Sequence, residues 1–123
     1  MKTIVLTNHL HSYGGSELLA IDVAKCFRKM GYQSYISAAI IDQNFKEIIN
    51  NHSLEFIDEK NIDINEFDII WSQHNRIIKF ANKQKIKKDL KIISVHLSPT
   101  TEYEIIGILP SKLLTNIFLR IQI

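Results

Sequence analysis

The stretch TIVLTNHLHSYGGSE at residues 3–17 decides the fold of this 123-residue chain. Residues 3–7 are short, apolar and rich in β-branched side chains, which is typical of a buried strand. A polar loop follows, and Gly14 and Gly15 lead directly into residues 16–30, where apolar side chains recur every three or four positions as in a helix. The pattern predicts a strand, a tight loop and a helix whose first N–H groups point at one spot. An anion such as phosphate suits that spot.

The ends of the predicted helix at residues 16–30 have suitable residues. Ser16 is expected as the N-cap, Glu17 as a favourable charge in the first turn, and Gly31 as the residue just beyond the helix. Cys26 is the single cysteine, which excludes an internal disulfide, and its place in the helix predicts a small buried side chain. The buried stripe is expected to contain Ala20, Val23, Phe27 and Met30, flanked by Leu19 and Ala24.

Strand and helix patterns continue to alternate along the chain. Further strands are predicted at residues 33–41, 54–57, 67–72 and 90–95, and further helices at residues 44–51 and 76–88. The acidic residues 58–66 have no clear period and are interpreted as a surface loop. Strands that alternate with helices of this length indicate βαβ units. We therefore expect an α/β fold, an open Rossmann-like parallel sheet with helices on both faces.

The last part of the chain gives a weaker pattern. Residues 100–107 are interpreted as a loop or a broken helix, and Pro110 as the start of a final helix. The sequence stops at Ile123, where another strand would be expected. Residues 1–123 are therefore expected to form a single Rossmann-like domain that is incomplete. An unpaired sheet edge would favour self-association.

The composition excludes several classes of protein. Hydrophobic residues make up 46% of the chain, which is enough for a buried core, and a net charge of +2 is too small to indicate nucleic-acid binding. The sequence shows no signal peptide and no run of about 18 apolar residues that could span a membrane. A cytoplasmic protein is expected, which could touch the inner face of the membrane. The lysines of residues 79–88 are most simply a solvated face, with attraction to anionic lipid as the alternative.

Histidines and other polar side chains follow several of the predicted strands. His9 follows the first strand with His11 beside it, His74 and Asn75 follow the fourth, and His96 follows the fifth. Because the carboxyl ends of parallel strands meet at one edge of the sheet, these side chains predict a polar cleft there. The glycine pair could instead be only a tight turn. His96 could be a loop histidine bonded to backbone, and His74 and Asn75 could be no more than a polar strand end.

The common nucleotide motifs are absent from the sequence, which contains neither G-x-x-x-x-G-K-[ST] nor G-x-G-x-x-G after the first strand. His9 and His11 do match the H-x-H that begins some metal-dependent hydrolases. A hydrolase would also use His74 and His96, but no carboxylate at the later strand ends completes a metal site. A metal-dependent hydrolase is thus one alternative. A non-catalytic Rossmann-like interaction domain is another.

Three segments together indicate a family. They are Gly14-Gly15-Ser16-Glu17 between a strand and a helix rich in Leu and Ala, FDIIWSQHN at residues 67–75, and IISVHLSP at residues 92–99. The first is similar to the Gly-Gly-x-Glu loop in the amino-terminal domain of GT-B fold glycosyltransferases. The other two resemble the fourth strand of that domain and its fifth strand with a trailing histidine. The closest resemblance is to retaining glycosyltransferase family 4, and it covers almost the whole chain.

The resemblance implies transfer of a sugar from a nucleotide-sugar donor to a glycan or lipid-linked acceptor, with no metal or other cofactor. It implies that Gly14 and Gly15 face the donor diphosphate. His96 would lie at the reaction centre as the catalytic residue, and His9, His74 and Asn75 would line the acceptor side. The second domain of such enzymes, with the nucleotide site and an E-x7-E motif, is not found in this sequence. These 123 residues alone are therefore expected to be inactive.

Overall fold

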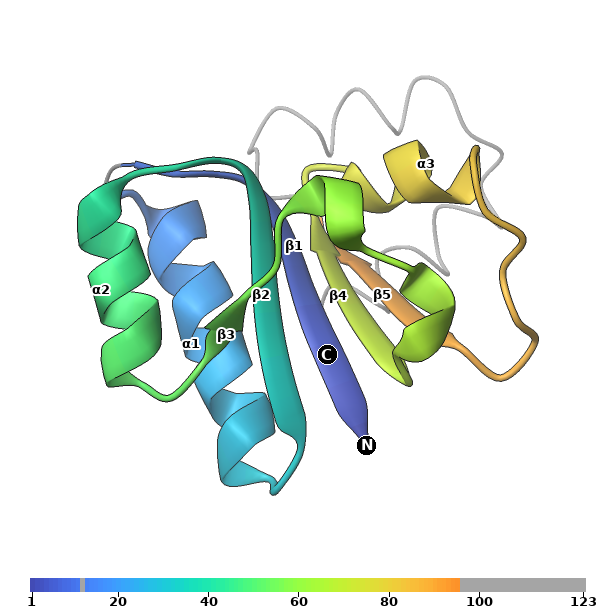
Figure 1. Cartoon of the computed structure of the whole chain (residues 1–123), viewed down its shortest axis with the longest axis horizontal. Helices are drawn as coiled ribbons and strands as arrows, with labels where there is room; N and C mark the ends of the chain where they lie inside the picture. The colour runs from blue at the N-terminus through green and yellow to red at the C-terminus, as the bar shows by residue number, and fades with distance from the viewer. Residues whose placement is uncertain (12, 96–123) are drawn as a thin grey trace, which may run out of the picture.

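The computed structural model describes residues 1–11 and 13–95 and shows an all-parallel, five-stranded open sheet of order β3-β2-β1-β4-β5 (Figure 1). The strands are β1 (Lys2–Leu10), β2 (Gln33–Ile41), β3 (Glu55–Phe56), β4 (Ile69–Gln73) and β5 (Lys91–Val95). The helices are α1 (Gly15–Lys29), α2 (Gln43–Asn51) and α3 (Arg76–Ala81), with two short 3-10 helices, η1 (Glu59–Asn61) and η2 (Ile64–Glu66). The predicted Rossmann-like α/β fold is confirmed.

The central strand β1 is the most deeply buried part of the sheet. It pairs with β2 on one side and with β4 on the other, and its residues Ile4 and Val5 have no exposed surface. A strand buried on both faces needs a nearly continuous apolar run, and residues 3–7 provide one. The chain moves outward from β1 to β2 and β3, then crosses back to β4 and β5. The carboxyl ends of all five strands therefore lie at the same edge.

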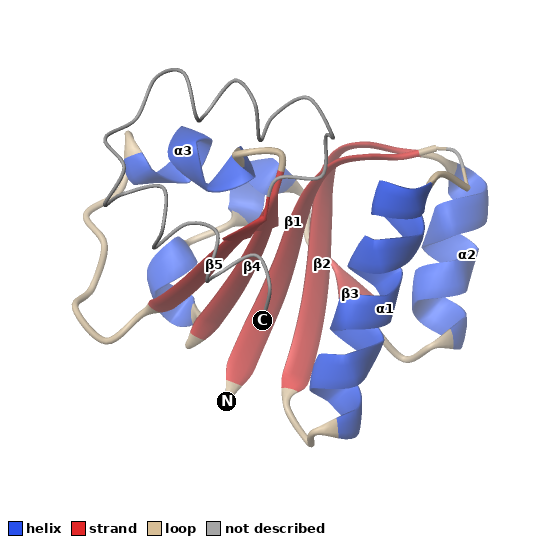
Figure 2. Ribbon diagram, turned by 180° about the vertical axis from the view of Figure 1, so that it is seen from behind, coloured by secondary structure: helices blue, strands red, loops and turns tan. Residues whose placement is uncertain are grey.

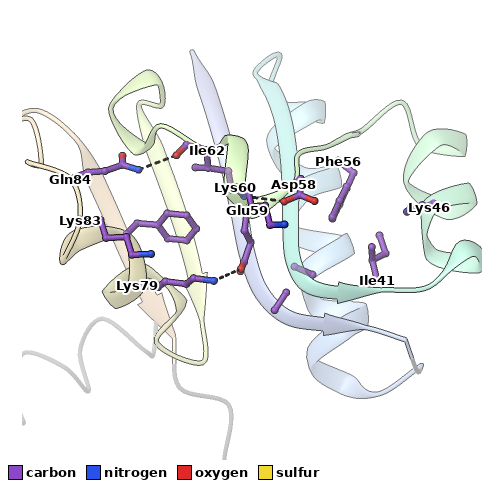
Figure 3. Close-up of a pocket in the computed structure, with 13 residues that line it drawn as sticks. Ile41, Lys46, Phe56, Asp58, Glu59, Lys60, Ile62, Lys79, Lys83 and Gln84 are labelled. Atoms are coloured by element: carbon purple, nitrogen blue, oxygen red, sulfur yellow. Dashed lines mark hydrogen bonds and ion pairs between the residues drawn. The ribbon is translucent and has the colours of Figure 1, made fainter.

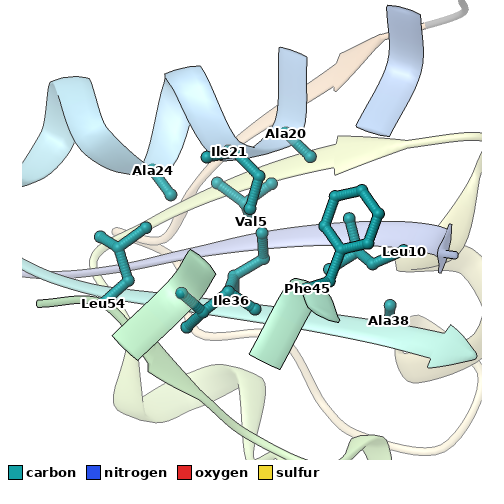
Figure 4. Close-up of a cluster of buried hydrophobic side chains, with 10 residues drawn as sticks. Val5, Leu10, Ala20, Ile21, Ala24, Ile36, Ala38, Phe45 and Leu54 are labelled. Atoms are coloured by element: carbon teal, nitrogen blue, oxygen red, sulfur yellow. The ribbon is translucent and has the colours of Figure 1, made fainter. Parts of the chain in front are cut away.

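Helices cover both faces of the sheet, as predicted (Figure 2). The face under α1 and α2 holds one buried cluster, seen in Figure 4: Val5, Leu10, Ala20, Ile21, Ala24, Ile36, Ala38, Phe45, Ile49 and Leu54. The opposite face, under α3 and the two 3-10 helices, holds a second cluster: Ile4, Leu6, Ile62, Ile64, Phe67, Ile70, Ile77 and Phe80. Ile4, Val5 and Leu6 of β1 alternate between the two clusters, as the period of a strand requires.

Helix α1 begins earlier than predicted, and its buried side is rotated. Gly14, not Ser16, is the N-cap, while Gly31 has a φ of 88° as expected for the residue that ends a helix. Met30 and Cys26 were expected inside, but both are exposed. The buried row of α1 has a spacing of three, one and three residues and consists of Glu17, Ala20, Ile21 and Ala24. Met30 and Cys26 are not part of this row.

The acidic segment at residues 58–66 is more than the surface loop that its lack of period suggested. It forms η1 and η2, and the side chains of Ile62 and Ile64 are buried in the second cluster. Asp58 and Asp63 cap the two 3-10 helices, accepting hydrogen bonds of 3.0 Å from the backbone N–H groups of Lys60 and Asn65. The segment crosses from β3 to β4, and its isoleucines fill part of the face that the short α3 leaves open.

Helix α3 ends at Ala81, well before the predicted end at residue 88. The next residues bond to the η2 region instead of continuing the helix. The Gln84 side chain donates to the Ile62 carbonyl at 3.0 Å and accepts from the Ile64 N–H at 2.9 Å. Asn65 likewise donates to the Lys85 carbonyl at 2.7 Å. Bonds between segments about twenty positions apart replace the bonds that a longer helix would have made.

The final helix predicted from Pro110 and the loop predicted at residues 100–107 lie outside the described residues, as does His96. Within residues 1–11 and 13–95, no helix is long and apolar enough to cross a membrane.

Candidate functional site at the carboxyl edge of the sheet

Strand β1 is longer than predicted, so His9 lies inside the strand and not in a loop after it. Pairing of β1 with β2 continues to Leu10 and Ile41, whereas its pairing with β4 ends at Leu6. The apolar run at residues 3–7 predicted too short a strand. The polar residues that follow it remain in β1 because their backbone still pairs with β2. His9 is half-buried and His11 exposed, and their rings meet edge to face with centroids 4.8 Å apart.

Gly14 and Gly15 stand at the start of α1, as predicted, but their surroundings differ. A Cβ atom on Gly14 would come within 2.5 Å of the Glu17 carboxylate, so the Glu17 side chain would have to shift if this residue were larger. A Cβ atom on Gly15 would meet no described atom within 4 Å. The space beside Gly15 is therefore open, and a ligand can approach the backbone of the first turn of α1 at this residue.

The Glu17 carboxylate controls the charge at this helix start. Its residue is only 7% exposed, and it accepts a 3.1 Å hydrogen bond from the Ser16 hydroxyl. A negative charge in the first turn stabilises a helix, but it also repels another anion. A phosphate would consequently contact the helix start at Gly15, away from the side where Glu17 packs on Gly14.

A fully buried glutamine joins the two halves of the predicted cleft. The Gln73 amide donates to the Thr7 hydroxyl at 3.2 Å and to the Ser16 carbonyl at 2.9 Å, and its oxygen accepts from the Trp71 indole N–H at 3.1 Å. These bonds link the end of β4 to β1 and to the first turn of α1. Gln73 directly precedes His74, so the predicted acceptor residues and the glycine loop lie at the same edge. Sequence alone placed Gln73 at this edge, but it did not indicate the bonds.

His74 and Asn75 form an unusual turn between β4 and α3. Both have left-handed backbones, with φ of 55° and 58°, and neither is glycine. Such a conformation costs about 1–2 kcal/mol for most residues with a side chain, and less for Asn, whose short polar side chain can bond locally. The turn is held from the strand, because the Ser72 hydroxyl accepts a 2.9 Å bond from the Ile77 N–H. Two strained residues in sequence favour a functional constraint at this turn.

The histidines of the carboxyl edge are only partly brought together. His9 and His11 are adjacent, but in the described ranges 1–11 and 13–95 no group of three or more His, Cys, Asp or Glu side chains could hold a metal ion. The alternative of a metal-dependent hydrolase also needs His96, which is outside these ranges. That alternative stays a prediction.

A separate pocket of about 750 Å³ opens between α2, η1 and α3, and none of the predicted site residues lines it. Its polar centre is Glu59, which forms ion pairs with Arg76 and, at 2.8 Å, with Lys79. Burial raises the pKa of the Glu59 carboxyl, but hydrogen bonds from Lys79 and Arg76 and their charges outweigh it, so the pKa is lowered. The sequence pattern treated Lys79 and Lys83 as a solvated face and gave no sign that Glu59 would lie opposite them.

The fold and this edge define a small Rossmann-like α/β protein with a five-stranded, all-parallel sheet. No protein-family model, curated protein or solved structure matches the chain.

Proposed function

We propose that this chain is the acceptor-side, amino-terminal domain of a retaining GT-B glycosyltransferase. The reaction would move a sugar from a nucleotide-sugar donor to a glycan or lipid-linked acceptor. One observation carries the proposal: buried Gln73 holds the start of α1 beside the strained turn at the end of β4. In open parallel sheets, ligands bind beyond the carboxyl ends of the strands, which is where these two features meet.

Each part of the edge has a role in this proposal. Negative charge grows on the leaving diphosphate during sugar transfer, and the N–H groups at Gly15 would stabilise it. His74 and Asn75, with His9 further along β1, would hold hydroxyl groups of the acceptor. The sequence resemblance adds His96 as the residue near the transferred sugar. A second domain would complete the donor site, so the chain by itself would bind donor weakly and transfer no sugar.

The proposal is tested by titrating the ¹⁵N-labelled chain with uridine diphosphate and then with uridine diphosphate glucose at millimolar concentration. Amide shifts are expected to change at Gly15, Ser16, His74 and Asn75, with little change in the outer strand β3. A chain whose carboxyl-edge amides do not respond to either compound would contradict the proposal.

Gly15→Asp gives a variant that keeps the fold while opposing the ligand. The new carboxylate has room, and at a helix start it stabilises the helix by about 0.3–1 kcal/mol. It would also repel a diphosphate, so the shifts should be lost although the protein is no less stable. Gly15→Ala is the matched control, because it adds the Cβ atom without the charge and should still bind.

A further inference from the structure

We propose that the pocket between α2, η1 and α3, called here the basic pocket, binds a phosphorylated small molecule that also has an apolar part. The basic pocket combines four lysines and two carboxylates with apolar side chains from the sheet and helices. Its lining is Ala38, Ala39, Ile41, Lys46, Phe56, Asp58, Glu59, Lys60, Ile62, Lys79, Phe80, Lys83 and Gln84. Its volume of about 750 Å³ is within the range of small-molecule sites, which is about 300–1,000 Å³.

The lysines approach the basic pocket from different segments of the chain. Lys79 and Lys83 lie on one side, Lys46 lies on the opposite side, and Lys60 lies between them (Figure 3). Such a distribution suits one anionic ligand that contacts several parts of the fold. A single helix face of solvated lysines would place its charges along one element only.

The charge of the basic pocket is not neutralised from within. Glu59 is shared between Arg76 and Lys79, so its negative charge is already matched by two cations. Within the part of the chain that the structure describes, Lys46, Lys60 and Lys83 form no ion pair. The Asp58 side chain is directed to the backbone of its own turn, where it accepts from the Lys60 N–H. An anion would therefore be attracted, and a divalent cation would not.

The apolar part of the lining selects among anions. The accessible apolar surface of the lining comes from Ala39, which is exposed, and from Ile41 and Phe56, which are half-buried. An inorganic ion would leave these side chains uncovered. A phosphate ester with an alkyl or ring body would cover them, and this burial of apolar surface favours the ester over the inorganic ion. This inference is independent of the proposed transferase activity, because none of His9, Gly14, Gly15, His74 or Asn75 lines the basic pocket.

The experiment uses the full 123-residue chain, ¹⁵N-labelled and titrated with inorganic phosphate or with hexyl phosphate. Hexyl phosphate is expected to bind at least tenfold more tightly, with amide shifts around Lys60, Phe80 and Lys83. Equal affinity for the two compounds, or shifts elsewhere only, would overturn the proposal.

Two double variants that remove the same amount of positive charge distinguish binding in the basic pocket from non-specific attraction of an anion to the protein surface. The double variant Lys60→Gln with Lys83→Gln removes two exposed lysines of the lining. The control double variant Lys85→Gln with Lys88→Gln removes two exposed lysines outside it. The first should lose at least fivefold in affinity and the second less than twofold. An equal loss in both would overturn the proposal. Thermal melts check that both remain folded.

A binding experiment with lipid vesicles shows whether the phosphate ester is a lipid headgroup or a free small molecule. If phosphatidylglycerol vesicles bind and hexyl phosphate displaces the chain from them, the basic pocket takes a lipid headgroup. If vesicles do not bind while hexyl phosphate does, it takes a free phosphorylated molecule. Vesicle binding that hexyl phosphate cannot displace, without shifts in the basic pocket, would contradict the proposal.

Discussion

The two faces of the sheet are covered in different ways. On one face, α1 and α2 pack rows of apolar side chains directly on β1 and β2. On the other, the six-residue helix α3 bonds to η1 through Lys79 and Glu59, and the segment after α3 bonds to the η2 region through Gln84 and Asn65. The first face therefore depends mainly on apolar area. The second also depends on directional polar contacts, which single substitutions can remove without creating a cavity.

The largest expected effect is on the first face. Phe45→Ala should lower the free energy of unfolding by about 3–5 kcal/mol, because the ring is 1% exposed and its loss leaves a cavity in the first cluster. Urea denaturation followed by circular dichroism measures this. Ile40→Ala is the control, since Ile40 is 58% exposed, and it should change stability by less than about 0.5 kcal/mol. A small effect of Phe45→Ala would mean that apolar packing does not dominate this face.

Gln84→Ala should destabilise the packing on the second face of the sheet and leave the packing of α1 and α2 on the first face unchanged. It removes the two bonds to Ile62 and Ile64, which should cost about 1–3 kcal/mol. Hydrogen exchange should show lost protection at the Ile64 amide while α1 amides remain protected. Gln84→Glu keeps the acceptor for Ile64 but loses the donor, so its effect should be intermediate. Uniform loss of protection over both faces would show that they are one cooperative unit.

Glu59→Gln tests the ion pairs of the second face through pH. The pKa of Glu59 is lowered in the folded protein, so its charge stabilises the fold above its ordinary value of 4.5. That contribution is lost as pH falls through the lowered pKa. Near neutral pH the variant should be less stable by about 1 kcal/mol, and this difference should shrink below pH 4.5. A difference that is constant with pH would indicate that shape and not charge matters at this position.

The smallest expected effect is at the strained turn. Asn75→Gly should change stability by only about 0.5–1 kcal/mol, in the stabilising direction, because glycine accepts the left-handed backbone at no steric cost. Ser53→Gly is a matched control, since Ser53 has a similar φ of 57° far from the carboxyl edge. Both melting temperatures should rise slightly. Only Asn75→Gly should reduce the amide shifts caused by uridine diphosphate glucose, and equal behaviour of the two would count against a role for Asn75.

The sequence predicted best the elements whose periodic pattern also sets their packing. Strand β2 has the predicted bounds, and α2 begins one residue before its predicted start and ends where predicted, because each pattern is local. It predicted α3 poorly, since the bonds of Gln84 to Ile62 and Ile64 decide where that helix ends. At the carboxyl edge, too, local features were predicted and contacts between distant residues were not.

At that edge, residue types and the parallel direction of the strands were enough to place Gly15, His74 and Asn75 just after the carboxyl ends of β1 and β4. The links made by Gln73 could not be predicted, because they join positions up to 66 residues apart. The basic pocket escaped prediction for the same reason. Its lysines come from separate segments whose patterns, taken singly, are those of solvated surfaces.

The strand order has a consequence for how the chain reaches its fold. Strands β1, β2 and β3 lie within the first 56 residues, so they and their two helices can associate early during synthesis. The other edge of β1 stays unpaired until β4 has been synthesised, and β4 begins only at Ile69. Contacts between distant positions form slowly, and an unpaired strand edge can meanwhile pair with another chain. Until Ile69 and its successors are synthesised, the strand that is most deeply buried in the finished protein is therefore the one most exposed to wrong pairing.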